Sequence, residues 1–413
     1  MKHSGIIFLI PGYESHLTMK TIIPKRKPGT REHTELERNE LLLTHMLFIF
    51  IASALSFIVP LYLLDIGIDI SLIGFILAMG PISFLFVRIF LASIADDIGT
   101  KSIAVGYSLL NAMAAILYSF VISPLGFAAA AVFEGVRNSG FWAIARTETF
   151  EFNGNRKKPG IALARFADMR QLADGLGRLA AGAVLAYFAF TGAFNLVMLL
   201  SAFLIILALI STERGLGGLH IDKHLLKRIF KNHPPSFWHT AVLIILLWVP
   251  HDILPVFLLP IFMASKLNLG YAEIGLLLAI FSIASAAFAL IFTKLRISNR
   301  KLILLTGLGI PALLLFPYSI VDNLVLLLVL ALSKGCALVV NEYLLTDQVC
   351  RSKDISTDVA VLNGPLQIAS FLFLALGGIT IAHFGFLPLF ALMAISLTLF
   401  VIVGNSLLKG TIT

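Results

Sequence analysis

The stretch FIVPLYLLDIGIDISLIGFILA, residues 57–78, decides the fold of this chain. It contains the end of one apolar run and the start of the next, joined by a short turn that carries its two acidic residues, Asp65 and Asp69. Followed outward, the runs cover about 42–64 and 70–93, and each reaches the roughly 20 apolar residues that a helix needs to cross a bilayer. The runs are continuous, without the alternation of barrel strands, so they predict two membrane-spanning helices.

The composition indicates that membrane-spanning helices make up most of the chain. Of 413 residues, 58% are hydrophobic and only 13% are charged, whereas a soluble domain carries roughly 25% charged residues. Soluble multidomain classes are therefore excluded, and two Cys residues exclude a disulfide scaffold. We predict an all-α polytopic membrane protein with twelve transmembrane helices, at about 42–64, 70–93, 102–121, 124–146, 165–190, 193–212, 238–262, 271–293, 301–320, 323–345, 355–382 and 385–408.

Two polar segments divide these spans. The cytoplasmic N-terminal tail is predicted over 1–40 and a basic cytoplasmic linker over 213–237. Between and after them lie an N-terminal six-helix bundle, 41–212, and a C-terminal six-helix bundle, 238–413.

The two bundles repeat one another at an offset near 200. SLIGFILAM (71–79) aligns with AEIGLLLAI (272–280), with Ile, Gly, Leu and Ala identical in register, and VPLYL around Pro60 aligns with LPIFM around Pro260. Matches in the same order at a nearly constant offset indicate a duplicated six-helix unit. Parallel repeats of this kind are typical of transporters whose binding site lies between two pseudo-symmetric halves.

The basic residues predict the orientation, because Lys and Arg stay on the cytoplasmic side. With a cytoplasmic N-terminus, the outer loops contain one of the 31 Lys and Arg residues, Lys266, and three more fall within spans: Arg137, Arg178 and Lys334. We expect a monomeric multi-pass protein of the cell (plasma or inner) membrane with both termini cytoplasmic.

The positive-inside topology and the attraction of basic residues to anionic lipid account for the net charge of +8, so no nucleic-acid partner is expected. The tail lacks a signal peptide, and Met19 is an alternative start.

The loop after the second span carries ASIADDIGTK, residues 92–101. It resembles the Gly-x-Leu-Ala-Asp-x-x-Gly-Arg-Lys signature of the major facilitator superfamily, with Ala92 in place of the first Gly. The positions that fit are Ala95, Asp96, Gly99 and Lys101. Together with the six-plus-six division, this resemblance implies a transporter with a central cavity, lined by the first, fourth, seventh and tenth spans, that takes a small-molecule substrate.

The resemblance also implies a latch at the cytoplasmic face that holds the two halves together in the outward-open state. Its predicted members are Arg88, Asp96, Gly99, Lys101, Arg146, Glu148 and Asp347. Charge networks at moving interfaces act as switches in many proteins. The alternative is a tight turn with ordinary positive-inside charge.

Charged residues deep in a span are costly and are therefore functional candidates. Glu134, Arg137 and Asn138 share one helical face, as do Asp174 and Arg178. The candidates for a substrate cavity are Glu134, Arg137, Asn138, Arg178, Trp248, Lys334, Asn341, Asn363 and Gln367. Two alternatives stay open: the neighbouring acid and base residues are ion pairs that neutralise each other, and the amides of Asn363 and Gln367 are interhelical hydrogen-bonding groups. Arg170, near the inner end of its span, is interpreted as an ordinary interface residue.

One pair of candidates links the two halves. Glu134 and Lys334 are 200 residues apart, so they occupy equivalent positions in the repeat with opposite charge. If the family's cavity carries over, they face each other or a shared ligand across the pseudo-twofold axis.

Asp252 is the main candidate for proton coupling, because no basic residue lies within one helical turn of it. An isolated buried carboxylate can bind and release a proton near neutral pH, and the adjacent His251 titrates in the same range. Asp174 and Glu342 are further candidates. The alternatives for Asp252 are an ion pair with Lys334 or Arg178 and a place in a wet outer vestibule.

These features predict a secondary active transporter that moves a small polar or amphiphilic solute by alternating access, with proton coupling. An uncoupled facilitator and a drug/proton antiporter are alternatives, although the span with DGLGRLAAGAVLA, 174–186, lacks the Pro of the antiporters' Gly-Pro signature. A non-transporting receptor is a more distant alternative. No CxxC, HExxH or P-loop motif occurs, so we expect no enzyme activity, no cofactor and no metal.

Overall fold

The computed structural model describes residues 35–98, 100–152, 159–210, 233–295, 297–319, 323–349 and 355–409. Every regular element in these ranges is helical. The elements are α1 (Glu35–Asp65), α2 (Ile70–Ile98), α3 (Thr100–Phe120), α4 (Pro124–Phe152), α5 (Pro159–Ile210), α7 (Pro235–Ile253), η1 (Leu254–Leu258), α8 (Leu259–Ser265), α9 (Tyr271–Leu295), α10 (Asn299–Thr306), α11 (Gly309–Leu315), α12 (Asn323–Val349), α13 (Ile355–Phe384) and α14 (Leu387–Lys409). The all-α polytopic fold is confirmed.

Each predicted span coincides with a helix or with consecutive helices. α5 contains two predicted spans, and the chain turns back between them at Ala189, whose backbone is not helical (φ 54°, ψ −172°). Within the described residues, nine helices are long and apolar enough to cross a membrane. α4 is not among these nine, because Glu134, Arg137 and Asn138 lower its hydropathy. These three residues face protein and cavity, where lipid does not exclude them.

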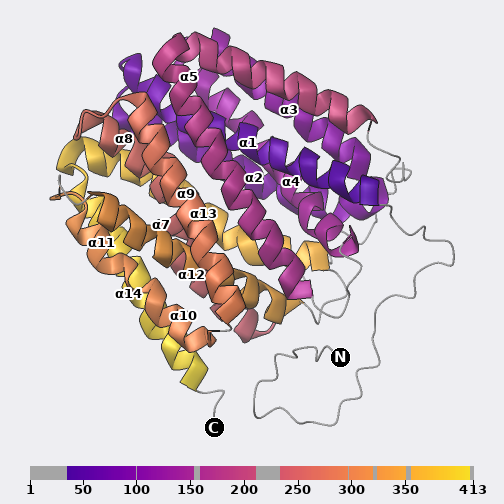
Figure 1. Cartoon of the computed structure of the whole chain (residues 1–413), viewed down its shortest axis with the longest axis vertical. Helices are drawn as coiled ribbons and strands as arrows, with labels where there is room; N and C mark the ends of the chain where they lie inside the picture. The colour runs from indigo at the N-terminus through magenta and orange to yellow at the C-terminus, as the bar shows by residue number, and fades with distance from the viewer. Residues whose placement is uncertain are drawn as a thin grey trace.

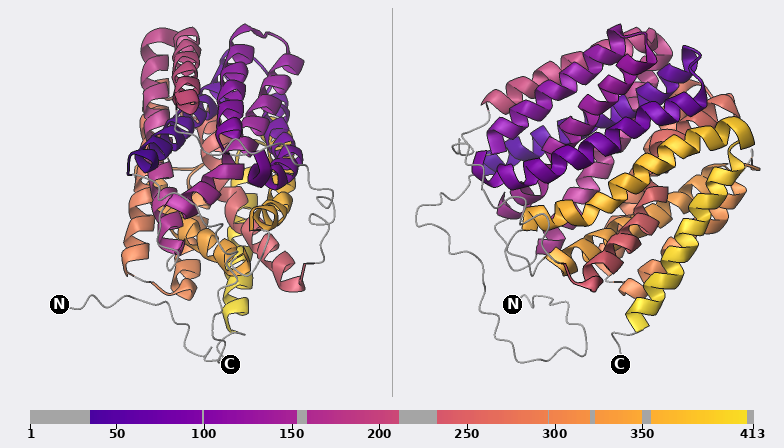
Figure 2. Two further views of the ribbon diagram at one scale, coloured as in Figure 1. Left: turned by 90° about the vertical axis from the view of Figure 1, so that its right-hand side faces the viewer. Right: turned by 180° about the vertical axis from the view of Figure 1, so that it is seen from behind.

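The helices form two halves that lie side by side (Figures 1 and 2). In the first half, α1 packs on α5 and α4 packs on both α2 and α3; in the second, α9 packs on α12 and α7 packs on α13 and α14. Across the halves, α2 runs along α13 and α5 runs along α9. We call the end with the turns at 66–69 and 266–270 the turn end, and the end where α5 stops and α7 begins the linker end. The halves diverge toward the linker end (Figures 1 and 2).

Two glycine contacts bring the halves together toward the turn end. Gly74 in α2 and Gly275 in α9 are equivalent in the repeat. A Cβ atom added at Gly74 would lie 2.8 Å from the Cα of Gly378, and one added at Gly275 would lie 2.8 Å from the Cα of Gly182. No real Cβ approaches a backbone atom so closely, so both contacts require glycine.

Gly74→Ala is expected to lower the apparent unfolding temperature of the purified protein in detergent by several degrees. The added methyl group meets backbone that cannot move aside, and such overpacking costs about 1–3 kcal/mol. Gly106→Ala in α3 is the matched control, because nothing lies within 4 Å of its new Cβ and alanine favours a helix by about 1 kcal/mol. Equal unfolding temperatures for the two variants would show that the α2–α13 contact tolerates a side chain.

Hydrogen bonds also close the turn end. The hydroxyl of Tyr271, the first residue of α9, donates to Oδ1 of Asp65 at the end of α1, with a separation of 2.9 Å. Within the turn itself, Asp69 Oδ1 accepts from the Ser71 N–H at 2.8 Å and from the Ser71 hydroxyl. These bonds stabilise the carboxylate and lower the pKa of Asp69. The first and second halves are therefore joined at this end by both packing and polar contacts.

Candidate functional site

A cavity of about 360 Å³ lies between the two halves. α1, α2, α4 and α5 line it from the first half, and α7, η1, α12 and α13 from the second. Each of the nine residues predicted for a substrate cavity contributes to its wall: Glu134, Arg137, Asn138, Arg178, Trp248, Lys334, Asn341, Asn363 and Gln367. Two of the proton-coupling candidates, Asp174 and Asp252, also line the cavity.

The charged groups around the cavity do not balance. Among the lining residues that the structure describes, five are cationic: Arg88, Arg137, Arg170, Arg178 and Lys334. Three are carboxylates: Glu134, Asp174 and Asp252. With all of them ionised, the wall of the cavity carries an excess of two positive charges.

Glu134 and Arg137 form an ion pair within α4, Nη2 to Oε1, at 2.7 Å. The second carboxylate oxygen of Glu134 accepts a hydrogen bond from the Tyr118 hydroxyl at 2.9 Å. The Arg137 side chain is 1% exposed, and its guanidinium lies 5.8 Å from the centre of the Phe48 ring. The charges of Glu134 and Arg137 therefore neutralise each other, which agrees with the alternative that these neighbours form an ion pair.

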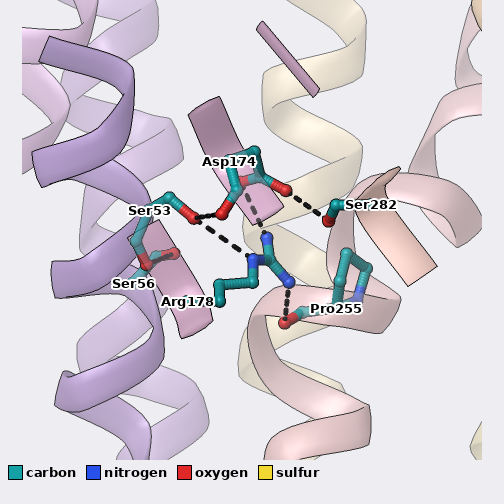
Figure 3. A network of polar contacts seen from close by, with 6 residues as sticks. All are labelled: Ser53, Ser56, Asp174, Arg178, Pro255 and Ser282. Carbon is teal, nitrogen blue, oxygen red and sulfur yellow. Dashed lines mark hydrogen bonds and ion pairs between the residues drawn. The ribbon is translucent and has the colours of Figure 1, made fainter. Parts of the chain in front are cut away.

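Asp174 and Arg178 form a second pair, within α5, at 3.1 Å from Nη2 to Oδ1. Figure 3 shows that both side chains also make contacts outside the pair. Arg178 also donates to the Pro255 carbonyl of η1, and the hydroxyl of Ser282 in α9 donates to Asp174. Each member of the pair thus contacts the opposite half.

Lys334 differs from these arginines. Its side chain is 4% exposed, and its Nζ lies 5.0 Å from the centre of the Phe281 ring, a cation–π distance. Within the described residues, Nζ has no hydrogen bond and no carboxylate within 4 Å. Lys334 and its repeat equivalent Glu134 line the same cavity, but Glu134 is already paired with Arg137.

Asp252 and His251 are consecutive in α7 and face different surroundings. Asp252 is accessible from the cavity and lines it, because α7 presents it to the open space between the halves. Its role in proton coupling stays a prediction. His251 is 1% exposed and lies outside the cavity wall, with Nε2 3.4 Å from the Ser333 hydroxyl. That hydroxyl donates to the Thr306 carbonyl at 2.7 Å. In the described part of the chain, no basic group lies within 4 Å of the Asp252 carboxylate.

The predicted latch lies mostly beyond what the structure describes. Arg88 is buried and lines the cavity, and Lys101 is half-buried at the start of α3. Gly99 lies outside the described residues, as do the side chains of Asp96, Arg146, Glu148 and Asp347. The latch therefore stays a prediction.

Arg170 is a cavity residue that sequence reasoning missed. It was interpreted as an ordinary interface residue, yet it lines the cavity, with its guanidinium 5.0 Å from the centre of the Trp142 ring. The signal was available, because Arg170, Asp174 and Arg178 follow one another at four-residue spacing on one helical face. Glu342, a proton-coupling candidate, is half-buried and absent from the cavity wall.

The described residues contain no group of three or more His, Cys, Asp or Glu side chains that could hold a metal ion. The described wall of the cavity combines cationic and acidic groups with aromatic side chains. The aromatic side chains include Phe48, Phe141, Trp142 and Trp248.

Comparisons with known proteins agree with this architecture. Residues 242–410 match the family model described as Major Facilitator Superfamily. No curated protein sequence matches the chain. Among solved structures, the human organic anion transporter MFSD10 (TETRAN) superposes with a TM-score of 0.62 at 14% identity, over 90% of this chain and 100% of that one. The second half of the chain therefore matches the Major Facilitator Superfamily, and the chain as a whole shares the fold of that transporter.

Proposed function

We propose that the protein is a secondary transporter that moves a small organic anion, or a zwitterion bound through its anionic group, by alternating access. The observation that carries this proposal is the excess of cationic groups among the described residues around the cavity, together with Lys334, which has no carboxylate within 4 Å in the part of the chain that the structure describes. The transporter of the same fold is named for organic anions, which supports this substrate class.

A bound carboxylate would complete the electrostatics of the cavity. An ammonium group buried without a counter-ion is costly, and a charge-assisted hydrogen bond from Lys334 to a solute anion removes that cost. The aromatic walls suit the organic part of the solute, because Phe48, Trp142 and Trp248 offer apolar faces next to the charged groups. A volume of about 360 Å³ is in the range of small-molecule sites.

The position of the cavity supports alternating access. It lies between two pseudo-symmetric halves that are closed at the turn end and diverge toward the linker end, and rocking one half against the other would expose it to the opposite side. The distribution of Lys and Arg supports a cytoplasmic linker end, with the protein in the cell membrane. Asp252, exposed to the cavity, is the group that we assign to proton coupling.

A matched ligand panel tests the substrate class. We would measure thermal shifts of the purified protein with a carboxylic acid, its amide, its amino-acid analogue and an amine, all of one carbon skeleton, at pH 6 and pH 8. Stabilisation by the acid and the zwitterion but not by the amide or the amine is expected. Stabilisation by the amine instead would contradict the proposal and favour a drug/proton antiporter. Uptake into proteoliposomes, with and without an imposed proton gradient, then separates a coupled transporter from an uncoupled facilitator.

A further inference from the structure

The carbonyl of Pro255 has no hydrogen-bonding partner in its own helix. In η1, a π-helical turn, the N–H of Leu259 bonds to the Leu254 carbonyl five residues earlier, and not to the Pro255 carbonyl four residues earlier. In the same register the Pro255 carbonyl would pair with residue 260, which is a proline and has no N–H. The π-helical turn and Pro260 together leave a carbonyl free in the middle of a span.

Arg178 of the opposite half occupies this carbonyl. Its Nη1 donates to the Pro255 oxygen at 2.9 Å, its Nε donates to the Ser53 hydroxyl at 3.2 Å, and its Nη2 donates to Asp174 Oδ1 at 3.1 Å. All three guanidinium nitrogens therefore have partners, and the side chain is 3% exposed. The contact joins α5 of the first half to η1 of the second (Figure 3).

Asp174 makes the second connection. Its Oδ2 accepts from the Ser282 hydroxyl of α9 at 2.7 Å, while Oδ1 holds Arg178. Its backbone carbonyl accepts from the Ser53 hydroxyl at 2.7 Å, which fixes α5 against α1. One carboxylate thus connects the arginine that reaches η1 with a serine of α9.

We infer that Asp174, Arg178, Pro255 and Ser282 form a lock between the two halves that holds the turn end closed. Opening the turn end would move α5 away from η1, because α1 and α5 of the first half pack there against η1, α8 and α9 of the second. The Pro255 carbonyl would then lose the Arg178 donor, and the guanidinium would lose one of its three partners among the described residues. An unpartnered buried polar group is costly, so the lock favours the closed arrangement.

The lock gives Asp174 and Arg178 a role other than those predicted from the sequence, which were proton coupling for Asp174 and substrate binding for Arg178. It rests on the proposed alternating access, but it does not depend on which solute is carried. Its strength should be measurable in the absence of any solute, as the ratio of closed to open turn ends.

Spin labels at the turn end test the lock directly. Ile66 and Lys266 are exposed in the two turns of opposite halves, so Ile66→Cys and Lys266→Cys, with both native cysteines replaced, report the distance between the halves in lipid nanodiscs. The parent protein should show one predominant short distance. Ser282→Ala should add a longer distance and raise the ratio of open to closed molecules by at least about tenfold, which is the lower end of the effect of losing a hydrogen bond to a charged group.

Ser285→Ala is the matched control. Ser285 is buried in the same helix, but its hydroxyl bonds to the Phe281 carbonyl of that helix at 2.6 Å. It should leave the distance distribution unchanged, and Ser282→Thr, which keeps the hydroxyl, should restore the short distance. Arg178→Lys keeps the charge but offers one nitrogen in place of three, so it should open the turn end at least as far as Ser282→Ala.

An unchanged distribution in both Ser282→Ala and Arg178→Lys would overturn the lock, and so would equal opening in Ser282→Ala and Ser285→Ala. Because no solute is present, these outcomes are independent of the ligand panel. A failed panel with an open turn end in Ser282→Ala would reject the anionic cargo and keep the lock.

Discussion

Replacement of Lys334 by Met is expected to weaken binding and uptake of an anionic solute about a hundredfold, because losing one partner of a buried charge pair costs about 2–5 kcal/mol. Met keeps the length and flexibility of the side chain and removes only its charge. The stability of the empty protein should be unchanged or higher, since Lys334 is a buried cation without an ion-pair partner among the described residues. Loss of transport without loss of stability is the diagnostic result.

Lys294→Met is the control for this prediction. Lys294 lies in the last turn of α9, is exposed, and does not line the cavity. Both variants would be compared by ligand-induced thermal shift and by initial uptake rate in proteoliposomes. Normal anion uptake by Lys334→Met would remove Lys334 from the binding site and, with it, the main support for an anionic cargo.

Asp252→Asn is expected to abolish accumulation of solute driven by a proton gradient while exchange of labelled for unlabelled solute continues. The amide cannot bind and release a proton, so the two halves of the cycle are no longer linked to proton movement, but the cavity keeps its shape. The side chain is suited to this role because it is exposed to the cavity, where it can exchange protons with whichever side the cavity faces.

Glu342→Gln serves as the comparison, because Glu342 was also a proton-coupling candidate and does not line the cavity. It should retain gradient-driven accumulation. If Glu342→Gln loses that accumulation and Asp252→Asn keeps it, the assignment of Asp252 is wrong. If both variants keep gradient-driven accumulation, a residue other than Asp252 and Glu342 couples the protons; a parent protein without such accumulation would be an uncoupled facilitator or would use another ion.

The positions of the spans could be predicted because crossing a bilayer is a local requirement on length and hydropathy. α4 illustrates the limit: its apolar run predicts a span, but its polar residues lower its hydropathy, and it is not among the nine helices of the described residues that are apolar enough to cross a membrane. The members of the cavity wall could be predicted for a related reason. Charged residues such as Glu134 and Lys334 have few places in a membrane protein other than its interior.

The ion pairs within α4 and α5 could be predicted from their spacing of three and four residues, but the contacts that these residues make with the opposite half could not. Arg178 binds a backbone carbonyl that is free only because a π-helical turn shifts the hydrogen-bonding register before Pro260, and no side chain marks that acceptor in the sequence. The difference between Asp252 and His251 is also a matter of rotation. Consecutive residues of a helix point about 100° apart, and the prolines around them obscure which one faces the cavity.

The glycine contacts at Gly74 and Gly275 bear on the speed of the transport cycle. Because no side chain stands between the two backbones there, one half can rotate against the other without a change of rotamer at the contact. The hydrogen bonds of the lock and the one between Tyr271 and Asp65 would have to break in that rotation, so they would contribute to the barrier between the two states. Turnover would accordingly respond to single hydroxyl groups at the interface, while changes in the apolar packing within either half would alter stability and leave the rate of conformational exchange nearly constant.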